Sequence, residues 1–144
     1  MSGQGNEISM NSDTNIPCVQ DIFPIATNDN FGECVARAAS RAKLIVLEFG
    51  ADWCPPCKQM RPLVHNVVDQ HPLYDLFYIN VDDDDWRDLI ESHGVESIPH
   101  TDILNPTMPW VRNEPIIGAD IDKLKTLMLK IEKEQREAAQ SNSN

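Results

Sequence analysis

The sequence is short of positive charge and of long apolar segments. Its 144 residues contain 12 lysines and arginines against 23 aspartates and glutamates, which gives a net charge of −11. Such an acidic chain is repelled by nucleic-acid backbones and by anionic lipid surfaces, so we expect neither as a partner. No apolar run approaches the roughly 20 residues that span a bilayer, so we expect no membrane insertion.

Cysteines are also few, and no secretory leader is evident. The four cysteines are too few for a small secreted scaffold that depends on several disulfides. Residues 1–15 have no basic start and no apolar segment, whereas a secretory leader needs both. These absences favour a cytoplasmic protein.

What remains is one domain between two polar ends. We predict flexible tails at residues 1–19 and 136–144 and a folded domain over residues 20–135, because periodic apolar patterns are confined to that range. The predicted strands are residues 20–26, 43–51, 76–82, 101–104 and 110–113. The predicted helices are residues 28–42, a segment starting near the paired prolines 55 and 56, residues 83–94 and residues 119–134. This alternation predicts an α/β domain with helices on both faces of a mixed sheet.

The stretch ADWCPPCKQM carries the clearest chemical signal, a cysteine pair with two prolines between its members. A structural zinc site needs four ligands, usually as two close pairs, and Cys54 and Cys57 form one pair only. We therefore expect no bound metal. Because proline is tolerated in the first helical turn, Pro55 and Pro56 predict a helix that begins at Cys54. The helix dipole would then favour a thiolate at Cys54 and leave Cys57 less exposed, as thiol–disulfide exchange requires.

Three segments resemble the thioredoxin family. LEFGADWCPPCKQMRP is similar to its active-site segment, HGVESIPH to the segment that ends at its cis-proline, and IIGAD to its last strand. The resemblance covers roughly residues 20 to 135. It implies a thioredoxin fold, with a central mixed sheet of about five strands flanked by four helices. It also implies dithiol–disulfide exchange that needs no metal or organic cofactor.

The resemblance assigns roles to individual residues. Cys54 would be the attacking thiolate, Cys57 the resolving thiol and Glu48 the proton acceptor for Cys57. The expected substrate-facing rim is Trp53, Ile98, Pro99 (with a cis peptide bond), Gly118 and Ala119. Taken one at a time, Trp53 would more simply be a core residue and Gly118 a turn, so the rim depends on the whole motif set.

Three positions depart from the family pattern. Tyr78 stands where many members carry a lysine paired with the buried acid, so its hydroxyl could donate to Glu48 or the side chain could merely pack. His100 follows the expected cis-proline, where it could stabilise the Cys54 thiolate or lie partly exposed at a strand end. Gly50 replaces a bulkier residue, which would leave the neighbouring groove more open.

The favoured function is that of a monomeric protein disulfide reductase, which accepts electrons from a reductase system and passes them to disulfide-containing proteins. Two alternatives remain open at this point. One is a binding or assembly subunit with this fold, in which the cysteines matter little. The other is a specialised reductase for a single partner.

Overall fold

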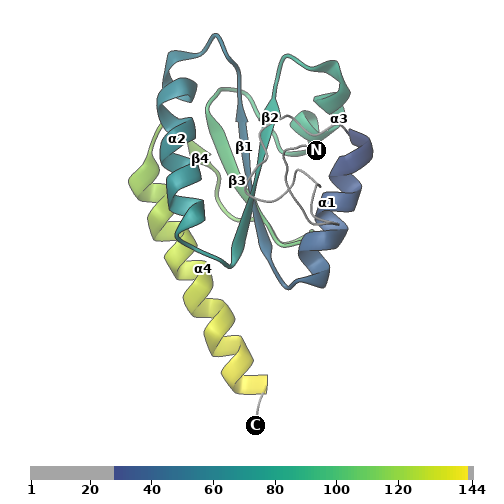
Figure 1. Ribbon diagram of the computed structural model, residues 1–144, viewed down its shortest axis with the longest axis vertical. Coiled ribbons are helices and arrows are strands. Elements are labelled where there is room, and N and C mark those ends of the chain that lie inside the picture. The colour runs from purple at the N-terminus through teal and green to yellow at the C-terminus, as the bar shows by residue number, and fades with distance from the viewer. Residues whose placement is uncertain (1–27, 143–144) are drawn as a thin grey trace, which may run out of the picture.

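The computed structural model describes residues 28–142, which form a sheet with helices on both faces (Figure 1). The helices are α1 (Asn28–Ser40), α2 (Pro55–Asp69), α3 (Arg87–Ser92) and α4 (Ile121–Asn142), and a short 3₁₀ helix, η2 (Asp84–Trp86), precedes α3. The strands are β1 (Leu44–Gly50), β2 (Tyr74–Asn80), β3 (His100–Leu104) and β4 (Ile116–Ile117), in the spatial order β2-β1-β3-β4. Strand β2 is parallel to β1, whereas β3 is antiparallel to both β1 and β4.

Strand β1 is central and is buried along its whole length. Leu44 and Val46 pack against α2 and α4, while Ile45, Leu47 and Phe49 pack against α1 and the η2–α3 segment. This alternation follows from the period of two in a strand, and it confirms the prediction of a central strand with helices on both sides. Figure 1 shows the two helical layers, α2 with α4 and α1 with α3.

The parallel β1–α2–β2 unit determines where the functional residues gather. Gly50 ends β1 beside Asn80, which ends β2, so both strands deliver their following loops to the same edge of the sheet. A hydrogen bond from Val81 N to Gly50 O holds these two loops together. Ligand and catalytic sites of α/β proteins favour this carboxyl edge.

The segment between β3 and β4 differs from the prediction. Residues 110–113 form a turn and irregular backbone, so the predicted strand there is wrong, and the last described strand is β4. Pro106, Pro109 and Pro115 lack the N–H groups that a sheet ladder needs, which explains the loss of regular pairing. The described residues thus form a four-stranded sheet, and the strand predicted at residues 20–26 and the tail at residues 1–19 lie outside them.

Helix α4 extends past the C-terminal boundary predicted for the domain at residue 135. A tail was predicted from residue 136, but α4 continues to Asn142. The sequence EQREAA at residues 134–139 consists of strong helix formers, so the helix persists although this part of it buries no apolar side chain. Among the described residues, no helix is both long enough and apolar enough to span a bilayer.

Candidate active site

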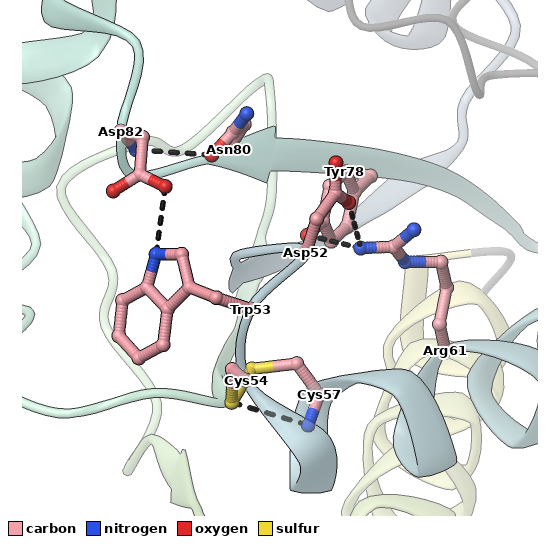
Figure 2. Close-up of polar contacts among 8 residues, drawn as sticks. All are labelled: Asp52, Trp53, Cys54, Cys57, Arg61, Tyr78, Asn80 and Asp82. Carbon is pink, nitrogen blue, oxygen red and sulfur yellow. Dashed lines mark hydrogen bonds and ion pairs between the residues drawn. A yellow bond between two sulfur atoms is a disulfide. The ribbon is translucent and has the colours of Figure 1, made fainter.

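Cys54 and Cys57 form a disulfide at the N-terminal end of α2, with their Cα atoms 5.2 Å apart (Figure 2). Cys54 has an extended backbone and is the N-cap residue, and Pro55 and Pro56 occupy the first helical turn, as predicted. The Cys57 backbone N–H donates to Cys54 Sγ at 3.3 Å. A sulfur atom in this place receives the unpaired N–H groups and the positive end of the helix dipole, both of which stabilise a thiolate.

The two sulfur-bearing residues lie in a small apolar cluster. Cys54 is 4% exposed and Cys57 1%, and both pack with Ala51, Val81 and Ile98. Cys54 is thus only slightly the more accessible of the two in the disulfide form. Its Sγ atom also lies 4.0 Å from the carbonyl oxygen of Ile98, which brings the chain before β3 next to the disulfide.

Backbone groups of the expected rim meet beside the pair. The Ile98–Pro99 peptide bond is cis, and Pro99 O accepts a hydrogen bond of 2.8 Å from Gly118 N. Gly118 has a φ of 84°, a conformation that glycine adopts without strain. Ala119 follows it and is exposed, so residues from α2, the segment before β3 and the end of β4 surround one surface.

Trp53 contributes an exposed aromatic face to this surface. Its side chain is 65% exposed, and its indole N–H donates to Asp82 Oδ2 at 2.8 Å (Figure 2). A pocket of about 220 Å³ lies against it, lined also by Val81, Ile90, Val95, Glu96, Ser97 and Ile98. The sequence predicted Trp53 at the rim but not Asp82, which holds the ring in place from the loop after β2.

Glu48 is the buried acid of β1. It is 1% exposed, and neither carboxylate oxygen has a hydrogen-bond partner among residues 28–142. Burial raises the pKa of Glu48 to about 7, although the positive charge of Arg61 works to lower it. Glu48 lies on the α2 side of the sheet, and its strand neighbours are Tyr78 and Thr101. A carboxyl group that titrates near neutrality can take up and release a proton under physiological conditions.

Tyr78 contacts a partner that the sequence did not reveal. Arg61 donates a hydrogen bond to the Tyr78 hydroxyl oxygen, and its guanidinium carbon lies 3.9 Å from the centre of the Tyr78 ring (Figure 2). Arg61 also lies 3.5 Å from Asp52 Oδ1. Tyr78 therefore neither donates to Glu48 nor merely packs. Arg61 follows Cys57 by four residues on α2, and this helical spacing is the signal that would have placed it near the pair.

His100 takes neither of the places considered for it. It is 2% exposed and packs edge-on against Phe49, on the face opposite Glu48. Its Nε2 atom lies 3.1 Å from Asp102 Oδ2, and His93 Nδ1 lies 2.8 Å from the same oxygen. Burial alone would raise the pKa of Asp102, but hydrogen bonds from His100 and His93 outweigh it and lower that pKa. This histidine–aspartate cluster belongs to the core.

The described part of the chain contains no group of three or more metal-ligating side chains that could hold an ion. Arg61 links the polar groups on the α2 side of the pair: it contacts Tyr78 and Asp52, and its positive charge acts on Glu48. This set suits proton and electron-pair movement at sulfur.

Comparison with known proteins gives a consistent result. The family model described as Thioredoxin matches residues 23–135. A thioredoxin from Ophiophagus hannah is 40% identical over 93 residues, which cover 62% of this chain and 80% of that one. A thioredoxin H-type from Fagopyrum esculentum is 34% identical over 98 residues, covering 68% and 80%.

Solved structures agree with the sequence comparisons. The germline-specific thioredoxin Deadhead from Drosophila melanogaster superposes with a TM-score of 0.64 at 31% identity, covering 74% of this chain and 95% of that one. The family match, the fold and the Cys54–Cys57 disulfide at the start of α2 converge, and the chain accordingly belongs to the thioredoxin family of thiol–disulfide oxidoreductases.

Proposed function

We propose that the protein works as a reductase of protein disulfides, with Cys54 as the attacking thiolate and Cys57 as the resolving thiol. The observation that carries this proposal is the position of Cys54 at the N-cap of α2, where its sulfur accepts a hydrogen bond from Cys57 N. Charge-assisted hydrogen bonds of this kind lower the pKa of a thiol and hold it ready for attack.

The reaction proceeds in two displacements. The Cys54 thiolate attacks one sulfur of the substrate disulfide; a bond forms between them, and the substrate's other sulfur leaves as a thiolate. Cys57 then loses its proton and attacks Cys54 Sγ. The bond between Cys54 and the substrate breaks, and its electron pair leaves with the second substrate thiolate. The substrate has gained two electrons, and the protein holds the Cys54–Cys57 disulfide. A dithiol donor from a reductase system restores the reduced form.

Glu48 is the proton acceptor for Cys57 in this scheme. Its pKa of about 7 matches the operating pH of a general base. Its side chain lies on the α2 side of the sheet, and Cys57 lies in the first turn of α2. The transfer passes directly or through one water molecule. Burial keeps the acid from bulk solvent and so keeps its pKa close to neutrality.

The substrate binds across the surface made by Trp53 and the chain around cis-Pro99. The carbonyl oxygen of Ile98 lies 4.0 Å from Cys54 Sγ, so a substrate strand laid beside this segment would place its disulfide against that sulfur. A neighbouring apolar side chain of the substrate would enter the pocket of about 220 Å³ beside Trp53.

Reduction of insulin disulfides with dithiothreitol as donor tests this function. The wild-type protein should accelerate precipitation of the insulin B chain, and Cys54→Ser should remove the acceleration. Cys18→Ser makes the same chemical change elsewhere in the chain and should retain it. Equal rates for wild type and Cys54→Ser would rule the function out.

A second experiment addresses the order of attack. The Cys57→Ser variant should accumulate a mixed disulfide through Cys54, because the resolving thiol is missing. Mass spectrometry of the trapped species identifies the cysteine that is joined to the substrate. A trapped link through any other cysteine would contradict the assigned roles.

A further inference from the structure

The missing side chain of Gly50 opens a space between two functional atoms. A Cβ atom added at Gly50 would lie 3.1 Å from Tyr78 Oη and 3.2 Å from Cys57 Sγ. Both distances are shorter than normal carbon contacts, so any other residue at this position would press on both atoms. The tyrosine hydroxyl and the resolving sulfur thus border the same small space.

The hydroxyl group in this space still has a hydrogen to donate. Arg61 donates to Tyr78 Oη, and a guanidinium group can only donate, so the oxygen acts as the acceptor in that bond. Burial raises the pKa of Tyr78 even though Arg61 works to lower it, so the hydroxyl keeps its proton. The hydroxyl hydrogen must therefore point away from Arg61. The space at Gly50 that Tyr78 Oη and Cys57 Sγ both border lies next to the hydroxyl.

Arg61 fixes the direction of this hydroxyl. The guanidinium group stacks on the Tyr78 ring at 3.9 Å and lies 3.5 Å from Asp52 Oδ1. The Arg61 side chain is 28% exposed, and a stacked, hydrogen-bonded guanidinium has little freedom to rotate. Figure 2 shows Asp52, Arg61 and Tyr78 grouped on one side of the disulfide, with Trp53 and Asp82 on the other.

We propose that Tyr78, held by Arg61, is a positioning residue that donates a hydrogen bond to the Cys57 sulfur when the disulfide is open, directly or through one water molecule. This role rests on the resolving function proposed for Cys57. Glu48 still takes the proton from Cys57, and Tyr78 transfers none. The hydrogen bond stabilises the Cys57 thiolate while its lone pair forms the bond to Cys54 and the substrate thiolate leaves.

The charged and titratable groups around Cys57 come from three elements. Glu48 comes from β1, Tyr78 from β2 and Arg61 from α2, and Asp52 lies in the connection from β1 to α2. Of these, the Tyr78 hydroxyl is the neutral donor, so it is the group that can be removed without changing the charge of the site.

The test follows Cys57 by mass spectrometry of the peptide that carries it, because Cys18 and Cys34 can also be alkylated. In a Cys54→Ser background, the rate of alkylation by iodoacetamide is followed against pH, first with Tyr78 and then with Tyr78→Phe. Removal of the hydroxyl should move the alkylation midpoint upward by about half to one pH unit. With both cysteines present, Tyr78→Phe should slow insulin reduction about three- to tenfold at neutral pH.

Tyr74→Phe is the matched control. Tyr74 is equally buried on the same strand, but its hydroxyl donates to Met128 O at 2.8 Å, away from the cysteine pair. This change should leave the Cys57 midpoint where it is. Equal midpoints for Tyr78→Phe and Tyr74→Phe would overturn the proposal, while the Cys54→Ser result in the insulin assay would still decide the proposed function separately.

Gly50→Ala provides a second variant if Tyr78→Phe does not fold. The added methyl group must displace Tyr78 Oη or Cys57 Sγ, so the Cys57 midpoint should again rise. Combined with Tyr78→Phe, it should add little further shift, since both changes break the same contact. An unchanged midpoint in Gly50→Ala, or fully additive shifts in the double variant, would count against a hydrogen bond between these groups.

Discussion

Glu48 and Asp102 lie on opposite faces of the sheet, and their carboxylates have different surroundings. On the α2 side, both oxygens of Glu48 lack a hydrogen-bond partner among residues 28–142. On the α1–α3 side, Asp102 binds two histidines at 2.8 and 3.1 Å. Burial without partners raises a carboxyl pKa, whereas hydrogen bonds to its charged form lower it. Glu48 can therefore exchange protons near neutral pH, whereas Asp102 stabilises the fold.

The largest expected effect on stability comes from removing the Asp102 carboxylate, which two histidines contact. Asp102→Ala should lower the free energy of unfolding by about 3–4 kcal/mol, because His93 and His100 would lose their shared acceptor inside the core. Urea denaturation of the purified protein measures this loss. Asp84→Ala serves as the control: Asp84 pairs with Arg87 on the surface, so its effect should stay below about 0.5 kcal/mol. A similar small change for Asp102→Ala would show that the buried cluster does not stabilise the fold.

A slightly smaller effect of opposite sign, a gain in stability, is expected when the Glu48 carboxylate is replaced. The folded-state pKa of Glu48 is raised from 4.5 to about 7, so ionisation weakens the folded state as the pH rises from about 4.5 to 7. Glu48→Gln should therefore be more stable than wild type by about 2–3 kcal/mol at pH 8 and nearly equal to it at pH 4. Thermal or urea unfolding at the two pH values checks this. A stability difference that does not change with pH would mean that Glu48 is not the titrating group.

The smallest expected effect concerns stability at low pH, where Asp102 and Glu48 should behave differently. Because the folded-state pKa of Asp102 is lowered, its contribution to stability is complete above its unfolded value and is lost as the pH falls through the folded value. Asp102→Asn should remove this loss, so its stability curve should be flatter than that of wild type below about pH 4. Unfolding curves between pH 2 and 5 provide the measurement. Parallel curves for the two proteins would contradict this assignment.

Much of the site could be predicted from local sequence. The alternation of Leu44 to Phe49 identified the central strand, and the two prolines identified the helix start that makes Cys54 its N-cap. Glu48 stood out because it was the only charge in an apolar run. These features depend on residues that are near one another in the chain, and the cis bond at Pro99 was expected only from the family resemblance.

The remainder depends on contacts between distant segments. His100 could not be placed without knowing that Asp102 and His93 share its face of the sheet, and Tyr78 could not be interpreted without Arg61 above its ring. The strand predicted at residues 110–113 is absent for a local reason: the three prolines in this segment leave too few N–H groups even for an edge strand.

The length of α4 has a practical consequence. Its 22 residues carry the chain past the lower edge of the sheet, whereas the disulfide sits at the start of α2, at the other end of the molecule (Figure 1). A bead or electrode surface coupled to the end of this helix would therefore leave the cysteine pair facing solution. The helix would act as a built-in spacer for immobilised enzyme.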